Sequence, residues 1–172
     1  KLIHGMRERG YTREFAEAIY AQIQGFAEYG FPESHAASFA LLAYASAWLK
    51  CHQPAAFLAA LLNSQPMGFY SPSQLVQDAR RHGVEVRAVD VIWSDWEATL
   101  ELAENAQPAV RLGMNLVRGL PQEAAWRIEE ARAVQPFSDL RDLALRASLS
   151  TADIQALAAA DALKNLAGHR RE

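Results

Sequence analysis

The stretch that decides the fold is residues 29 to 44, which read YGFPESHAASFALLAY. Gly30 and Pro32 are typical of the end of a helix, and Ser34 is a residue type that caps the start of the next one. The helix that begins near Ser34 should run to Lys50 with scarcely a polar side chain on any face. A helix that is apolar nearly all round is expected in the middle of a domain, so this segment predicts a mainly α-helical core.

Further helical and strand patterns flank this segment. Thr12 can cap an upstream helix, because the apolar residues that follow it recur every three or four positions and share one face: Phe15, Ile19, Ile23 and Phe26. Downstream, the pattern predicts helices at residues 55–62, 71–82, 122–133, 140–147 and 151–160. Short alternations of polar and apolar residues between 84 and 114 flank a polar turn at 104–107, which predicts a small β element.

The composition is that of a globular chain. With 172 residues, 51% of them hydrophobic and 22% charged, the chain can bury one good core or two modest ones. Its single cysteine, Cys51, excludes an internal disulfide and a cysteine-rich zinc site. No apolar run is long enough to span a bilayer and the first residues do not resemble a signal peptide, so we expect a soluble, cytoplasmic fragment of a longer protein that makes no contact with membranes.

The charge is distributed unevenly along the chain. The net charge of −3 argues against a strongly basic nucleic-acid binder. Residues 1–63 are neutral, residues 64–107 carry three basic against seven acidic side chains, and residues 108–172 carry nine basic against eight acidic. Only the last third could therefore meet phosphate through side-chain charge, and only weakly.

Several blocks of the sequence resemble a known family. Residues 29–44, with AWLK at 47–50 and PAAF at 54–57, resemble the fingers of bacterial C-family replicative DNA polymerases, the α subunit of DNA polymerase III. The wording SHAASF at 34–39 and NSQPMGFYSPSQL at 63–75 is similar to the error-prone branch of that family, often called ImuC. The resemblance covers essentially the whole chain.

The resemblance implies a mainly α fold in three parts. Residues 1–63 would form the C-terminal part of the polymerase fingers, and residues 64–107 a linker helix and a small β-hairpin element. Residues 108–172 would form a tandem helix-hairpin-helix domain that binds DNA. The catalytic palm would lie upstream of Lys1.

Ser34 and His35 are the candidate nucleotide-binding residues. At the first turn of a helix, a hydroxyl, a titratable cation and backbone N–H groups favour an anion such as a triphosphate. The alternative is that Ser34 only caps the helix and His35 is a core histidine. Replicative relatives usually carry a lysine where Glu33 stands, so nucleotide would be held differently or less tightly here.

A first candidate DNA-binding hairpin reads LVRGLPQEAA at residues 116–125. Glycine at a tight turn allows close approach to phosphate, proline presets the next helix, and free N–H groups at a helix start bind phosphate oxygens without reading bases. The predicted contacts are Arg118, Gly119, Leu120, Pro121 and Gln122. The alternative is a simple connector between two helices.

A second, degenerate hairpin is expected near residues 159–163. It has Asp161 in place of the turn glycine, so we expect it to support the fold more than to bind phosphate. Arg170 and Arg171 behind it could contact phosphate, or they could be solvated charges at a helix end. Trp93 and Trp96 could stack on bases, although two tryptophans beside a small sheet more commonly form the core that covers it.

The sequence offers no metal site of the kind that a polymerase palm uses. DNA polymerases hold two magnesium ions between acidic side chains, but no Asp-x-Asp occurs here and the five histidines show no ligand spacing. Mg²⁺ is therefore expected only in the parent protein, with none bound by this fragment and no catalytic residue within it.

The resemblance implies a part of an error-prone, DNA-directed DNA polymerase used in damage-induced translesion synthesis. Its partners would be primer-template DNA, deoxynucleoside triphosphate and, in the parent, a Y-family-like accessory protein and the sliding clamp. Two alternatives stay open. One is a stand-alone helix-hairpin-helix DNA-binding module, and the other is a helical scaffold for a protein partner with a docking face at Phe57, Leu58, Leu61 and Leu62.

Overall fold

The structure is a computed structural model that describes residues 2–28, 33–104 and 107–167, without the side chains of residues 26–28, 33–34 and 167. The predicted helix stop at Gly30 and Pro32, together with Arg170 and Arg171, lies outside the described residues. The elements are α1 (Leu2–Glu8), α2 (Arg13–Glu28), α3 (Glu33–His52), α4 (Pro54–Asn63), α5 (Pro72–Arg81), β1 (Val86–Arg87), β2 (Thr99–Glu101), β3 (Ala109–Arg111), the 3₁₀ helix η1 (Met114–Leu116), α6 (Gln122–Val134), α7 (Leu140–Arg146), α8 (Thr151–Ala159) and α9 (Lys164–Ala167).

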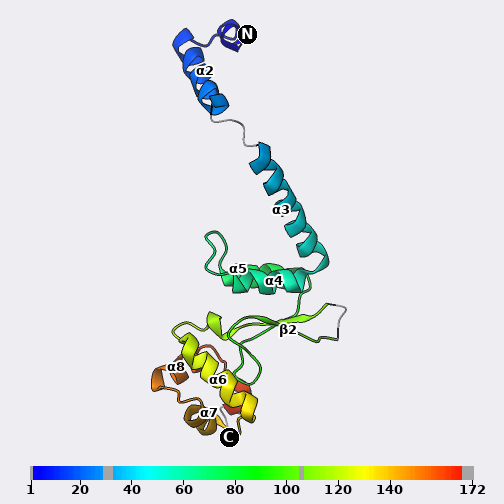
Figure 1. The fold of residues 1–172 in the computed structure, drawn as a ribbon, viewed down its shortest axis with the longest axis vertical. Coiled ribbons are helices and arrows are strands. Elements are labelled where there is room, and N and C mark those ends of the chain that lie inside the picture. Colours follow the sequence, from blue (N-terminus) through cyan, green and yellow to red (C-terminus); the bar gives the residue numbers. More distant parts are fainter. Residues whose placement is uncertain (1, 29–32, 105–106, 168–172) are drawn as a thin grey trace. The chain divides into compact units, whose positions relative to one another are not determined.

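These elements form a mainly α fold with one small sheet, as predicted (Figure 1). They belong to two compact units, residues 1–45 and 46–172. The proposed division at residues 63 and 107 concerns function and stays a prediction. None of the described helices is both long and apolar enough to cross a membrane.

The first unit contains α1, α2 and most of α3. Thr12 caps α2 as predicted, since its hydroxyl accepts a hydrogen bond from the Phe15 N–H at 3.3 Å. Among the described residues of this unit, only Ala16 is buried. The apolar face of α2 is open, with Phe15 49% and Ile23 48% exposed. This unit therefore has almost no hydrophobic core of its own.

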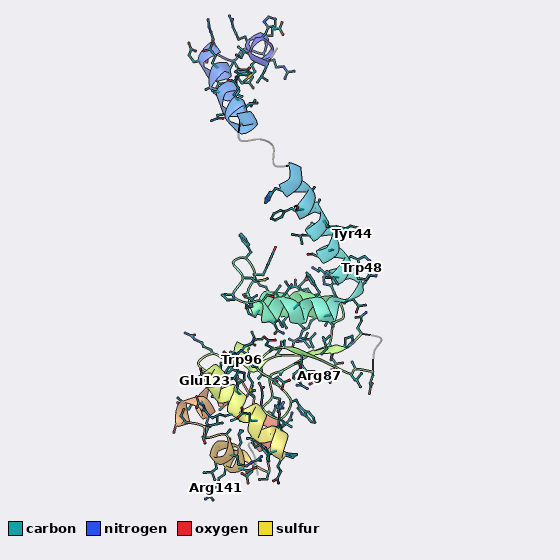
Figure 2. All side chains as sticks on the ribbon, in the orientation of Figure 1. Tyr44, Trp48, Arg87, Trp96, Glu123 and Arg141 are labelled. Atoms are coloured by element: carbon teal, nitrogen blue, oxygen red, sulfur yellow. The ribbon has the colours of Figure 1, made fainter. Side chains whose placement is uncertain are left out.

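The prediction that the segment after Ser34 forms a buried core is wrong for this chain. Every residue from His35 to Cys51 is exposed, and Tyr44 and Trp48, labelled on α3 in Figure 2, are 71% and 47% exposed. A helix is buried by the elements around it, and its own apolar pattern does not show whether the same chain supplies them. The described residues provide no layer that covers α3.

The second unit begins with α4 and α5 packed against a three-stranded sheet. The strand order is β1-β3-β2, with β3 antiparallel to β2 and parallel to β1. The core between the helices and the sheet contains Leu58, Leu62, Val76, Val84 and Val110 among its buried residues. The side-chain amide of Asn63 fixes the end of α4, because it both donates to the Ala98 carbonyl at 3.0 Å and accepts from the Ala98 N–H at 2.8 Å.

A second core joins α6, α7 and α8 to residues 89–91 and 114–120. Its fully buried members include Met114, Ile128, Leu143 and Leu157. Gly113 lets the chain enter this core, because a Cβ built there would lie 2.4 Å from the Trp96 carbonyl oxygen. Local caps set the helix starts, as at Ser150, whose side chain accepts from the Asp153 N–H while Asp153 accepts from the Ser150 N–H.

Candidate nucleic-acid interface

The first predicted hairpin is a tight turn that joins η1 to α6. The Leu120 N–H donates to the Val117 carbonyl at 3.2 Å, and Gly119 between them has φ +85°. Such a four-residue turn with positive φ at its third residue requires glycine. Val117 and Leu120 are buried in the C-terminal core, 4% and 6% exposed, so both ends of the turn are fixed.

This turn leaves several backbone donors unused. Arg118 and Gly119 are exposed, and within the described chain neither of their N–H groups donates a hydrogen bond. The N–H groups of Gln122 and Glu123 lie in the first turn of α6, where no intrahelical acceptor exists. A Cβ built at Gly119 would meet no atom within 4 Å, so the space beside the turn is open. The hairpin therefore has four backbone N–H groups that are free to donate hydrogen bonds to an anion.

The second predicted hairpin, between α8 and α9, has a different hydrogen-bond pattern. Its Asp161 has φ +55°, so it adopts the left-handed backbone conformation that Gly119 adopts in the first hairpin. Here the turn donors are used internally, because the Asp161 N–H donates to Ala158 and the Ala162 N–H to Leu157, at 3.2 and 3.0 Å. The exposed side chain of this turn is a carboxylate. Geometry thus separates an open first hairpin from a closed second one.

Four of the seven described basic side chains of the last third are already engaged. Arg127 donates to the Ala147 carbonyl at 2.8 Å, and Arg132 pairs with Asp95 at 2.6 Å. Arg111 pairs with Glu101 at 2.8 Å, and Arg146 donates to the Gln135 carbonyl at 2.8 Å.

Three exposed cations of the same region make no ion pair with any described residue. They are Arg118, Arg141 and Lys164. Arg118 lies within the open hairpin, next to Gly119, whose N–H group is free. Sequence inspection identified Arg118 but missed Arg141, Lys164 and the Glu123 N–H. The predicted start of a helix at residue 122 could have indicated the Glu123 N–H, because N–H groups in the first turn of a helix have no intrahelical acceptor.

The predicted nucleotide site lies in the other unit. Ser34 is in the first turn of α3, but its side chain is outside the described residues. His35 is exposed, and its ring lies 4.3 Å from the Phe39 ring, one helical turn further along. The described residues therefore form no core around His35.

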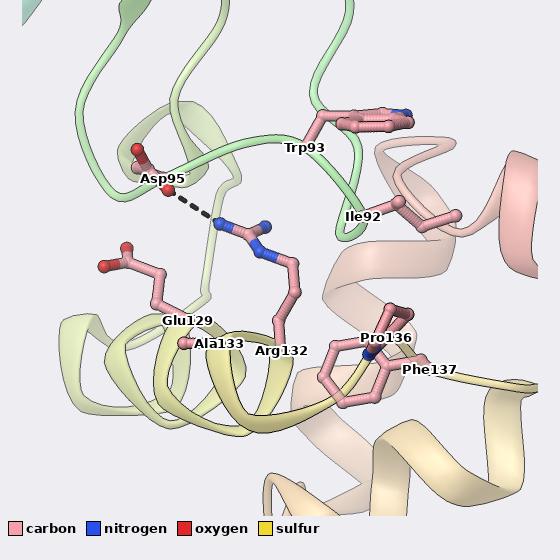
Figure 3. A pocket seen from close by; sticks show the side chains of 8 residues that line it. All are labelled: Ile92, Trp93, Asp95, Glu129, Arg132, Ala133, Pro136 and Phe137. Carbon is pink, nitrogen blue, oxygen red and sulfur yellow. Dashed lines mark hydrogen bonds and ion pairs between the residues drawn. The ribbon is translucent and has the colours of Figure 1, made fainter.

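The two tryptophans after β1 have different surroundings. Trp96 packs against the C-terminal core, whereas Trp93 is 60% exposed, so the interpretation of both as core residues is wrong for Trp93. Trp93 lines a pocket of about 590 Å³ near the C-terminal end of α6 (Figure 3). Figure 3 shows Arg132 between the carboxylates of Asp95 and Glu129 on one side and the aromatic side chains on the other. The net negative lining is unsuited to a phosphate backbone.

A larger pocket of about 1070 Å³ lies at the C-terminal end of α3 and beside α4 and α5. Three residues of the predicted protein-docking face, Phe57, Leu58 and Leu61, line it. The fourth, Leu62, is fully buried in the core and cannot contribute to a docking surface. Within residues 2–28, 33–104 and 107–167, no three His, Cys, Asp or Glu side chains gather in a way that could hold a metal ion.

Comparison with known proteins agrees with this geometry. Residues 83–172 match the family model described as the helix-hairpin-helix motif. The chain is 65% identical over 172 residues to a protein named "Error-prone DNA polymerase" from Bordetella parapertussis, covering 99% of this chain and 16% of that protein. Proteins of the same name from Burkholderia mallei and Methylococcus capsulatus are 63% and 59% identical, with 100% and 99% of this chain covered.

The match concerns one segment of those proteins. The chain spans between 16% and 18% of the length of these relatives. The resemblance to error-prone polymerases that the blocks around residues 34–39 and 63–75 indicated is thereby confirmed. The chain belongs to the helix-hairpin-helix family, and over nearly its whole length it is homologous to a segment, about one sixth of the length, of proteins named error-prone DNA polymerase.

Proposed function

We propose that this chain binds the duplex of primer-template DNA, without reading its sequence, as part of an error-prone DNA-directed DNA polymerase. The observation that carries the proposal is the open hairpin at residues 117–123, whose unused N–H groups and unpaired Arg118 form a site for a backbone phosphate. Phosphate contacts made by main-chain groups need little net positive charge, which fits a domain with nearly balanced charges.

The names of the relatives support a DNA polymerase activity for the parent. The parent would add deoxynucleotides to a primer during translesion synthesis in the cytoplasm, using Mg²⁺ held by a palm outside this chain. Ser34 and His35 would contact the triphosphate of the incoming nucleotide from the first turn of α3. A Y-family-like accessory protein and the sliding clamp would be its partners.

Duplex binding by the 172-residue chain tests the hairpin directly. Gly119→Val should abolish most binding, because a side chain disfavours the positive φ and its bulk keeps the phosphate away from the N–H groups. Arg118→Ala should bind more weakly and lower the slope of log affinity against log salt by about 0.9, the contribution of one phosphate contact. Both losses should be equal for duplexes of unrelated sequence, since phosphate carries no base information.

Gly83→Val is the matched control for strain. Gly83 has φ +81° and, like Gly119, open space beside it, but it ends α5 and its N–H already donates to Arg80. The control should lose a similar amount of stability and keep its duplex affinity, with circular dichroism showing that each variant is folded. If the folded Gly119→Val protein binds duplex with the affinity of the wild type, the turn only connects two helices and does not bind DNA. Absence of salt-dependent binding in the wild type would favour the protein scaffold.

A further inference from the structure

Asp161 occupies a conformation that few non-glycine residues adopt. Among the described residues, only Ser148 and Asp161 combine a side chain with positive φ, at 49° and 55°. Aspartate and asparagine tolerate this region better than most residues. Asp161 also stands at the position in the second hairpin that Gly119 holds in the first, followed in both by a buried residue, Ala162 or Leu120, and then by a helix.

One core holds both turns. Leu120, Ala162 and Leu163 belong to the same buried cluster, and the Val91 N–H donates to the Ala162 carbonyl at 3.0 Å. Electrostatic screening lengths are about 10 Å at 0.1 M salt and about 30 Å at 0.01 M. Because the two turns share one buried cluster in a small domain, we expect a duplex held at Gly119 to lie within the screening length of the Asp161 charge at low salt.

No described cation pairs with the Asp161 carboxylate. Its side chain is exposed and takes part in no ion pair or side-chain hydrogen bond with a described residue. Lys164 follows three residues later but does not form an ion pair with Asp161. The N–H groups of Asp161 and Ala162 donate to carbonyls of α8 and are not free. Where the first hairpin offers donors, the second offers a carboxylate.

We propose that the Asp161 carboxylate repels the phosphate backbone and so lowers the affinity of the first hairpin for duplex DNA. We call this effect the electrostatic brake. This inference rests on the proposed binding of duplex at Gly119. It assigns the second hairpin a negative contribution to affinity in place of the purely structural role that its degenerate sequence suggests.

Asp161→Asn tests the brake in the 172-residue chain. Asparagine keeps the left-handed backbone and the shape of the side chain and removes only the charge. The variant should bind duplex about 3- to 10-fold more tightly at 0.01 M salt, and the gain should fade at high salt because screening removes the repulsion. Asp161→Gly, which also relieves the backbone, should show the same gain.

Asp139→Asn is the matched control, because Asp139 caps α7 and asparagine caps equally well. It removes the same charge from an exposed position outside both hairpins, and should therefore change affinity less. Asp161→Asn binding equal to the wild type at all salt concentrations, with Gly119→Val still defective, would overturn the brake and leave the first hairpin in place. Normal binding by Gly119→Val would instead overturn the proposed function.

Discussion

Gly119 and Gly113 show two different reasons for a glycine at a single position. At Gly119 the backbone conformation requires it, while the neighbouring space is empty. At Gly113 the reverse holds, because its φ of −79° is ordinary and the carbonyl of Trp96 fills the place of a Cβ. Only the first kind leaves room for a ligand. Gly119 therefore has the open space that the proposed phosphate contact needs.

His35 is the residue at which the nucleotide proposal can be tested. In the full-length parent, His35→Ala should raise the KM for deoxynucleotide about tenfold while changing DNA affinity little, since a lost phosphate contact costs on the order of 1.4 kcal/mol. The measurement is steady-state primer extension with varied nucleotide, beside a duplex-binding titration.

Asn in place of His35 serves as the control, because it can still donate a hydrogen bond while lacking the titratable charge. An unchanged KM in His35→Ala, accompanied by a lower melting temperature, would assign His35 to packing.

Among the elements, the sheet carries the most concentrated ion-pair cluster. Arg87 and Arg111 lie side by side on the paired strands β1 and β3 and would repel each other. Glu101 on β2 holds both, at 2.6 Å to Arg87 and 2.8 Å to Arg111. The Arg111 hydrogen bond, more than that of Arg87, lowers the pKa of the Glu101 carboxyl below its ordinary value near 4.5.

This lowered pKa makes the sheet sensitive to acid. The stabilisation by ionised Glu101 is fully present above about pH 4.5, the unfolded value, and is lost as the pH falls through the lower pKa of the folded state. Glu101→Gln should cost about 1 to 2 kcal/mol at neutral pH, because it leaves two adjacent guanidinium groups without their shared anion in a partly solvated site.

Urea unfolding at several pH values provides the measurement. The difference between wild type and Glu101→Gln should shrink below pH 4.5, while the control Glu97→Gln, at an exposed carboxyl outside the cluster, should match the wild type throughout. A difference that stays constant with pH would show that Glu101 stabilises the sheet by shape alone.

All described helices except α1, α9 and η1 were predicted from sequence, because local signals set their limits. Proline, glycine and capping serines define α5 and α8 to within a residue or two, as at the Ser71 and Ser150 capping boxes. The parallel pairing of β1 with β3 depends on contacts between residues far apart in sequence, which no local pattern records. For the same reason, the sequence identified the hairpin at Gly119 but could not show that Arg127 and Arg132 are occupied.

At the scale of the whole molecule, the chain spans only 16% to 18% of the length of its relatives, so we do not expect it to carry out polymerisation alone. We expect no primer extension by the purified chain with Mg²⁺ and deoxynucleotides, because the resemblance places the carboxylates that hold the two metal ions outside it. A gel assay with labelled primer measures this, with a complete C-family polymerase as the positive control. Extension that survives repurification and stays with the chain would contradict the assignment to fingers and duplex-binding regions.

The contrast between the two units has a consequence on the timescale of amide hydrogen exchange. Buried apolar side chains form two clusters in residues 46–172, whereas Ala16 alone is buried among the described residues of the first unit. Helices without a packed face open readily, so the amides of α2 and the first half of α3 should exchange within seconds, and those of α6 near Ile128 only with global unfolding. Slow exchange of the α3 amides in the isolated chain would mean that another part of this chain, or a second copy of it, covers the apolar side chains of α3.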